Sequence, residues 1–154
     1  MNRVLFVCLG NICRSPAAAA VFAAKALARD VEVTVSSAGT GGWHAGEGAD
    51  PRMIAAASRR GYSLDRHRAR QVDLSDFYDF DVLLAMDLRN QADLFVMAPP
   101  DRKCDIRLFL DFADTKARET PDPFYGEDKG FERVLDLIEA GADGFLAHLE
   151  ESGS

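Results

Sequence analysis

The sequence begins with an uninterrupted apolar run, Val4–Cys8, and this run most constrains the fold. A continuous apolar strand is typical of a parallel sheet covered on both faces, whereas a half-exposed strand alternates apolar and polar residues. Further strand-like segments follow at residues 31–35, 80–86 and 106–112. Helical segments separate them. We therefore expect an α/β fold: a single domain with a four-stranded parallel sheet and helices on both faces.

Helix signals fill the intervals between these strands. Ser15 and Pro16 suit the N-cap and the first position of a helix that an alanine-rich stretch then continues. In the last segment, apolar residues recur at three- and four-residue spacing, while Gly141 and Gly144 each cost about 1 kcal/mol relative to alanine. The expected helices cover residues 17–29, 50–60, 88–97 and 128–150.

Composition limits the class of protein and its partners. A chain of 154 residues suffices for one core, so we expect residues 1–154 to form a single domain. No apolar run approaches the ~20 residues of a membrane span, and no secretory signal is evident. The net charge of −7 argues against nucleic acid or an anionic membrane as the main partner. Three cysteines are too few for a disulfide scaffold, which favours a reducing, cytoplasmic location.

The candidate chemistry lies in the segment Cys8–Pro16, where the first strand turns into the first helix. Backbone N–H groups at such a junction can enclose an anion, and the helix dipole adds positive potential. Gly10 and Asn11 tolerate the left-handed conformations of a tight cradle, and Arg14 offers a planar fork that matches two phosphate oxygens. The same field favours a nucleophilic thiolate. We therefore expect a phosphate-binding loop here rather than a structural cysteine beside a solvated arginine.

Residues Val7–Pro16, with the sequence VCLGNICRSP, resemble the signature of the low-molecular-weight protein tyrosine phosphatases. The segment 122–126, DPFYG, resembles the acid loop of that family, and the likeness covers nearly the whole chain in size and order of elements. The resemblance implies hydrolysis of protein phosphotyrosine and of small aryl phosphates. It implies that Cys8 is the nucleophile that forms a phosphocysteine, that Arg14 binds phosphate, and that Asp122 is the general acid and base.

The resemblance also implies roles for the residues around the nucleophile. Ser15 would assist Cys8 as the leaving group, and Ser37 and His67 would belong with Asn11 to a network that holds the loop in shape. The alternative for His67 is a surface position in a basic run. The phosphate-binding loop would comprise Leu9, Gly10, Asn11, Ile12, Cys13 and Ser15.

Aromatic residues match the positions that line the family's substrate slot. Trp43 is flanked by glycines, which mark a loop rather than a core. Phe124 and Tyr125 follow Asp122-Pro123. Phe124 stands where many members have tyrosine, so it keeps an aromatic wall but removes a hydroxyl that can be phosphorylated.

Two other activities remain open on the same fold. An arsenate reductase would need further cysteines downstream, and this chain offers only Cys104. A protein arginine phosphatase resembles a loop with threonine where this chain has Ile12. A catalytically inactive phosphate-binding module is disfavoured because neither Cys8 nor Asp122 is lost. The histidines, one of them His148, show no ligand spacing, so we expect no metal and no other cofactor.

Partners and regulation follow from the same resemblance. We expect the substrate to be a tyrosine-phosphorylated protein, with tyrosine kinases among the candidates, and the enzyme to be a monomer or a weak dimer. Cys13 lies at the far end of the loop that begins at Cys8. A loop curled round one phosphate brings its ends together, so we expect peroxide to inactivate the enzyme reversibly through a Cys8–Cys13 disulfide.

Overall fold

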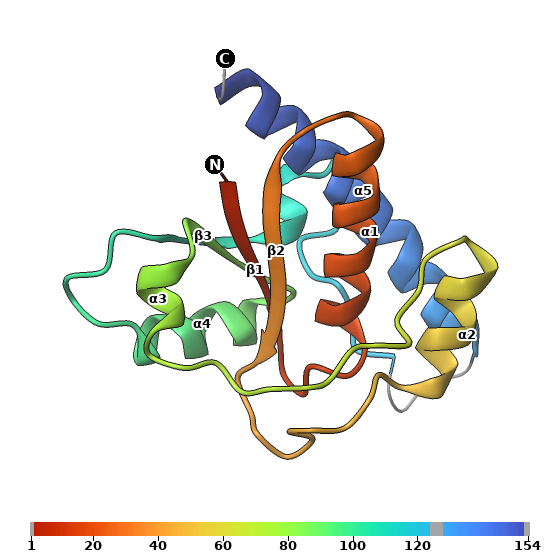
Figure 1. Cartoon of the computed structure of the whole chain (residues 1–154), viewed down its shortest axis with the longest axis horizontal. Helices are drawn as coiled ribbons and strands as arrows, with labels where there is room; N and C mark the ends of the chain where they lie inside the picture. The colour runs from red at the N-terminus through yellow and green to blue at the C-terminus, as the bar shows by residue number, and fades with distance from the viewer. Residues whose placement is uncertain (1, 124–127, 153–154) are drawn as a thin grey trace.

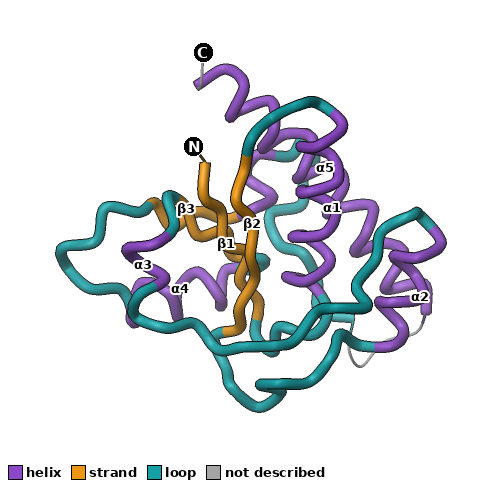
Figure 2. Tube along the Cα trace, viewed as in Figure 1, coloured by secondary structure: helices purple, strands orange, loops and turns teal. Residues whose placement is uncertain are grey.

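The first apolar run forms an inner strand of a four-stranded parallel sheet with helices on both faces (Figures 1 and 2). A computed structural model describes residues 2–123 and 128–152. The strands are β1 (Asn2–Cys8), β2 (Val33–Gly39), β3 (Val82–Ala85) and β4 (Asp105–Leu108), in the order β2-β1-β3-β4. This architecture confirms the predicted single-domain α/β fold.

Strand β2 lies further along the chain than predicted. It was expected at residues 31–35, but it pairs with the whole of β1, from Asn2 opposite Val33 to Cys8 opposite Gly39. The two serines of β2 are therefore part of the sheet. They sit there because the backbone ladder, not apolar periodicity, decides the length of this strand.

The last two strands are shorter than predicted. Strand β3 lacks the ends of the expected segment 80–86, and β4 stops at Leu108 instead of continuing to residue 112. A 3₁₀ helix, η1 (Phe109–Phe112), follows it. Phe109 and Leu110 are both buried although they are consecutive, which a strand with one buried face does not allow but a tight turn does.

The helices divide between the two faces of the sheet, with α1 and α5 on one side and α3 and α4 on the other (Figure 1). They are α1 (Arg14–Ala28), α2 (Pro51–Arg59), α3 (Asp76–Asp79), α4 (Leu88–Met97) and α5 (Asp128–Ser152). The short α3 was not predicted. Over the described residues, no helix is both long and apolar enough to cross a membrane.

Helix α1 begins two residues before Pro16, the predicted first helical position. Its N-cap is Cys13, which makes no capping hydrogen bond through its side chain, and its first residue is Arg14. Ser15 does not serve as the cap because its hydroxyl is hydrogen-bonded to the Cys8 sulfur and to Asn11 instead. The expected cap residue has thus been diverted to the candidate site.

Strand β1 separates two clusters of buried side chains. Val4 and Phe6 point to the cluster that contains residues of α1, α2 and α5. Leu5 and Val7 point to the other cluster, which contains residues of α3 and α4. The alternation is that of a strand buried on both faces, and it explains why the run is apolar throughout.

Gly144 of α5 lies against the backbone of η1. An ideal Cβ at this position would lie 1.8 Å from the carbonyl oxygen of Phe112. The glycine was expected only to weaken the helix, but here it permits a close approach between α5 and η1. Its cost in helix propensity is offset by packing that no other residue allows.

We expect Gly144→Ala to lower the free energy of unfolding by about 3 kcal/mol, although alanine is the better helix former, because the methyl group must displace backbone. Urea denaturation followed by circular dichroism measures the change. The matched control is Ala147→Gly, at an exposed position of the same helix, which should cost only about 1 kcal/mol. A stabilised Gly144→Ala variant would contradict the close approach.

Candidate active site

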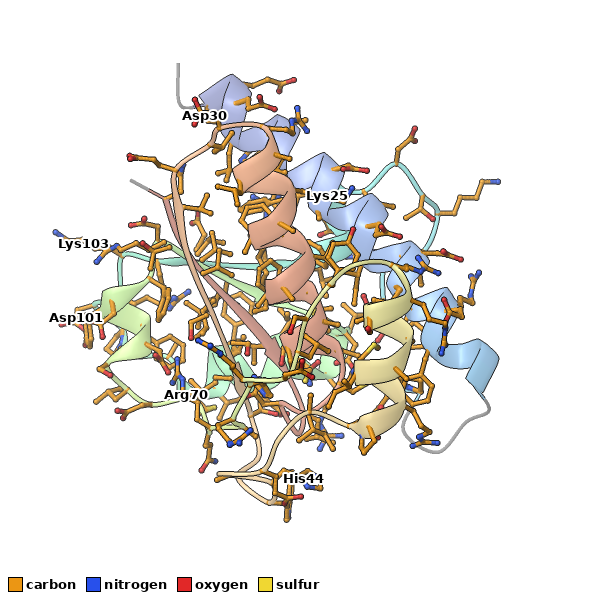
Figure 3. All side chains as sticks on the ribbon, turned by 45° about the vertical axis from the view of Figure 1, so that its right-hand side comes forward. Lys25, Asp30, His44, Arg70, Asp101 and Lys103 are labelled. Atoms are coloured by element: carbon orange, nitrogen blue, oxygen red, sulfur yellow. The ribbon has the colours of Figure 1, made fainter. Side chains whose placement is uncertain are left out.

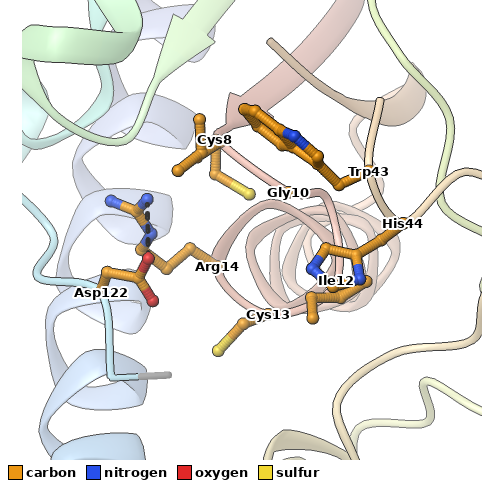
Figure 4. A pocket seen from close by; sticks show the side chains of 9 residues that line it. Cys8, Gly10, Ile12, Cys13, Arg14, Trp43, His44 and Asp122 are labelled. Carbon is orange, nitrogen blue, oxygen red and sulfur yellow. Dashed lines mark ion pairs between the residues drawn. The ribbon is translucent and has the colours of Figure 1, made fainter. Parts of the chain in front are cut away.

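The phosphate-binding loop joins the carboxyl end of β1 to the N-terminus of α1, where parallel sheets bind ligands. The loop after β2 is fastened to it, since Thr40 and Gly41 donate backbone hydrogen bonds to the carbonyl oxygens of Cys8 and Leu9. A pocket of about 360 Å³ opens over this junction (Figure 4). It is lined by Cys8, Leu9, Gly10, Ile12, Cys13, Arg14, Trp43, His44 and Asp122.

The Cys8 sulfur receives hydrogen bonds from two directions. The backbone N–H of Asn11 donates to it at 3.3 Å, and the Ser15 hydroxyl lies 2.9 Å away. The Ser15 oxygen accepts a hydrogen bond from the Asn11 side-chain amide at 2.8 Å, so its own hydrogen can point to the sulfur or to the more distant Ala38 carbonyl oxygen at 3.4 Å. Donors directed at a sulfur beside a helix N-terminus are the surroundings of a nucleophilic cysteine.

Asn11 holds the loop in a left-handed conformation, with φ of 57°. Its side-chain amide donates to the hydroxyls of Ser15 and Ser37, and its side-chain oxygen accepts from the backbone N–H of Arg70. Its carbonyl oxygen lies 2.6 Å from Nε2 of His67. The structure therefore brings together the residues for which a supporting network was predicted, and it joins the loop to β2 and to the segment before α3.

Burial lowers the pKa of His67 below its ordinary value of 6.5, although the hydrogen bond to the Asn11 carbonyl opposes that shift. The nearby Arg68 lowers the pKa further. A neutral imidazole must carry its proton on Nε2 in order to donate to the carbonyl oxygen. His67 is thus a neutral donor beneath the loop rather than part of a solvated basic face.

Arg14 is almost fully buried, with 3% of its side chain exposed. Its Nη1 donates to Oδ2 of Asp87 at 2.7 Å and to the carbonyl oxygen of Thr120 at 3.0 Å, while its Nη2 lies 3.7 Å from Oδ2 of Asp122. Burial alone would lower the pKa of Arg14. Cys8 and the two carboxylates outweigh this effect and raise it. The guanidinium therefore stays charged and is held beside Asp122 in the lining of the pocket (Figure 4).

Asp87 is a site residue that the sequence analysis missed. It is the N-cap of α4, and its Oδ1 accepts the backbone N–H of Asn90 at 2.7 Å while Oδ2 binds Arg14. The available signal was its place at the carboxyl end of a parallel strand, immediately before a helix. What the sequence did not reveal is that this strand neighbours the one carrying Cys8.

His44 was also missed as a lining residue. Its Nδ1 lies 3.1 Å from Oε2 of Glu47, and its ring would meet a Cβ at Gly10 at 3.0 Å. Figure 3 shows it on the loop after β2. The His44 ring thus lies close over Gly10, and its place next to Trp43 in a glycine-flanked loop was the only signal in the sequence.

The structure places Asp122 and Trp43 on opposite sides of the pocket (Figure 4). The Asp122 carboxylate is 39% exposed and Trp43 is 73% exposed, so both face the pocket mouth rather than the core. Phe124 and Tyr125 lie outside the described residues. Among the described residues, no cluster of three or more His, Cys, Asp or Glu is arranged to hold a metal ion.

Cys13 is buried in the same loop as Cys8, and both are free thiols. Burial raises the pKa of the Cys13 thiol far above its ordinary value, and the neighbouring Cys8 raises it further. Cys13 is therefore a protonated neighbour of Cys8.

We expect His67 to make the stability of the protein sensitive to mild acid. Its folded pKa is lowered, so protonation favours the unfolded state, and stability is lost as the pH falls below 6.5. His67→Gln keeps a donor but does not titrate. The difference in free energy of unfolding between wild type and variant should therefore shrink on acidification, as measured by urea denaturation at a series of pH values. The matched control is His148→Gln on α5, and an equal change there would contradict the assignment.

Comparisons with known proteins agree with the geometry of the site. A sequence model of the family described as "Low molecular weight phosphotyrosine protein phosphatase" matches residues 3–154. A low molecular weight protein-tyrosine-phosphatase of Streptomyces coelicolor is 44% identical, over 97% of this chain and 94% of that protein.

Solved structures share the whole fold. A protein tyrosine phosphatase of Entamoeba histolytica matches with a TM-score of 0.95 and 41% identity, covering 100% of both chains. A Drosophila arginine phosphatase matches with a TM-score of 0.90 and 32% identity, covering 96% of this chain and 97% of that one. By its sequence, its fold and the loop between β1 and α1, this chain belongs to the low molecular weight phosphotyrosine protein phosphatase family.

Proposed function

We propose that the protein hydrolyses phosphotyrosine in proteins through a phosphocysteine on Cys8. The observation that carries the proposal is the meeting of Cys8, Arg14 and Asp122 in one pocket at the N-terminus of α1. A nucleophile, a fixed cation and an exposed carboxyl group are the three groups that this reaction requires. The hydrogen-bond donors around the sulfur support the role of Cys8.

In the first step, the Cys8 thiolate attacks phosphorus and the bond to the tyrosine oxygen breaks. Arg14 and the backbone N–H groups of the loop hold the equatorial oxygens as charge shifts in the transition state. Asp122 donates its proton to the leaving phenolate. Because Asp87 and the Thr120 carbonyl already fix the guanidinium, little reorganisation is needed when phosphate arrives.

In the second step, Asp122 takes a proton from water, the water oxygen attacks phosphorus, and the phosphorus–sulfur bond breaks. The Cys8 sulfur leaves as a thiolate, and the Ser15 hydroxyl donates to it. Asn11 takes no part in the chemistry itself. It supports this step because its side-chain amide donates a hydrogen bond to the Ser15 oxygen and so orients the hydroxyl. Trp43, with Phe124 and Tyr125, forms the slot for the aromatic ring in this proposal.

Phosphoarginine is the second candidate substrate, favoured by the likeness to the Drosophila arginine phosphatase. Ile12 lines the pocket at the position where threonine would favour phosphoarginine, so phosphotyrosine is preferred. Arsenate reduction finds less support. Cys104 is buried in the α3–α4 cluster, whereas Cys8 belongs to the cluster on the other face of the sheet.

The proposal extends to the whole chain and its surroundings. Residues 1–154 form a single phosphatase domain, which the family match over residues 3–154 supports. A phosphatase of this family acts on phosphoproteins, and we propose a tyrosine kinase as one such substrate. Three free cysteines, one of them the nucleophile, support a reducing, cytoplasmic location.

We expect Asp122→Ala to lower kcat on a phosphotyrosyl peptide by roughly 10²–10⁴-fold, the usual worth of a general acid. The loss should be much smaller on an aryl phosphate whose leaving group is already a good anion, because no proton is needed. Steady-state assays on both substrates and on phosphoarginine measure this. Equal losses on both aryl substrates would sink the acid role, and faster turnover of phosphoarginine would replace the proposed substrate.

The nucleophile has its own control. Cys8→Ser should abolish turnover but still bind inorganic phosphate, because the loop amides and Arg14 remain. Isothermal titration calorimetry measures the binding. Cys104→Ser is the matched cysteine control, since Cys104 lies in the other core cluster, and it should retain wild-type turnover.

We also propose that peroxide inactivates the enzyme reversibly. Peroxide oxidises the Cys8 thiolate to a sulfenic acid and is itself reduced to water. The Cys13 thiolate then attacks the Cys8 sulfur, forming the disulfide and releasing hydroxide. Because the pKa of Cys13 is raised, its thiolate is scarce at neutral pH, so this second step should accelerate as the pH rises.

After peroxide, dithiothreitol should restore activity in the wild type but only poorly in Cys13→Ser. Recovery in the wild type should improve as the pH of the peroxide treatment is raised from about 6.5 to about 8.5. Mass spectrometry of the peptide that carries both cysteines detects the loss of two hydrogens. Equal recovery in both proteins would leave Cys13 as a packing residue.

A further inference from the structure

Helix α4 carries apolar side chains on its outer side as well as on its inner side. Leu94 faces inward and is fully buried. On the other side, Leu88, Phe95 and Val96 are 43%, 49% and 86% exposed, and Ala92 between them is exposed too. Large apolar residues scattered singly on a surface need no explanation, but three on one helix face, with Ala92 between them, do.

The spacing shows that these four residues form one stripe. Positions 88, 92, 95 and 96 follow the i, i+4, i+7, i+8 pattern of a helix face that packs against another element. Helix α4 lies on the opposite side of the sheet from α1 and α5 (Figure 1). Within the described chain, the guanidinium of Arg102 lies 5.5 Å from the centre of the Phe95 ring, and the Glu119 carboxylate accepts the backbone N–H of Leu88 at 3.1 Å.

Charged residues border the stripe along one edge. Arg89 and Asp93 are one turn apart, with 83% and 36% of their side chains exposed and 3.5 Å between Nε and Oδ1. Arginine N-terminal to aspartate is the weaker order for such a pair, because it opposes the helix dipole. The pair within one helix is therefore weak, and Arg89 and Asp93 lose little free energy when they leave it to bind a partner.

The surface formed by the stripe and its charged edge is complementary to the same surface on a second copy of the chain. A two-fold axis through the middle of the stripe sets a second α4 antiparallel to the first and brings the same edges of the two helices together. Ala92 then meets Ala92 at the centre, where small side chains allow close approach. Leu88 meets Phe95 and Val96 of the other copy, and Arg89 meets Asp93.

We propose that two copies of this chain associate through α4 in this antiparallel arrangement. Charge complementarity selects a second copy, because Arg89 of each copy pairs with Asp93 of the other copy across the axis. The two pairs also offset part of the repulsion between chains of net charge −7. A contact built on one ten-residue helix lies at the lower end of specific interfaces, so the dimer is weak.

Sedimentation velocity of the full chain tests the association. Between about 10 µM and about 1 mM, we expect the weight-average mass of the wild type to rise towards twice that of the monomer. Val96→Asp and Ala92→Arg should hold the protein monomeric over that range. The matched control is Leu27→Asp, which introduces the same charge at an equally exposed leucine on α1 and should still associate.

Charge reversal tests the arrangement itself. Arg89→Asp and Asp93→Arg should each weaken association about tenfold, and the double reversal should restore it, because the pairs are then exchanged across the axis. Thermal melts of each variant exclude misfolding. A wild type that stays monomeric, a Leu27→Asp variant that dissociates, or a double reversal that does not recover would each overturn the proposal.

Discussion

The burial of one arginine is the constraint on which the rest of the site depends. An ionised side chain that leaves water must be paired, and removing its partner typically costs about 3–5 kcal/mol. Arg14 meets that requirement with three groups from two separate parts of the chain: the N-cap of α4, and the segment that supplies the Thr120 carbonyl and the Asp122 carboxylate. The guanidinium proposed to bind phosphate therefore also fastens α4 and the segment 120–122 to the first helix.

Asn11, the left-handed residue of the loop, fixes the shape of the loop as Arg14 fixes its surroundings. Asn11 occupies a backbone conformation that most residues avoid, and it is held there because its amide, its side-chain oxygen and its carbonyl all have partners. Those partners come from α1, β2 and the segment before α3. The shape of the phosphate cradle is thus set by its surroundings rather than by its own sequence alone.

The sequence predicted what local chemistry decides. The apolar run of β1, the loop from Cys8 to Arg14 and the helix expected over residues 50–60 are all signalled by neighbouring residues. The run forms a strand as expected, and the helix is found within one residue of its expected ends. The roles of the individual site residues remain predictions.

Features set by distant contacts were not predictable. The part of Asp87 depends on β3 lying next to β1, and the end of β4 depends on Phe109 packing against Phe6 with ring centres 5.1 Å apart. The prediction of Ser15 as a helix cap was wrong because its hydroxyl is hydrogen-bonded to the Cys8 sulfur, at the other end of the loop. Each error arose where a tertiary contact prevailed over a local preference.

The two clusters divided by β1 leave the protein with two half-cores that share a backbone but few side chains. Effects of substitutions on opposite faces should therefore combine additively, since additivity holds for sites without shared partners. Selection can remodel the α3–α4 half while the packing behind the phosphate loop stays the same. One phosphate-binding loop could in this way be kept while the outer face over the other half-core changes.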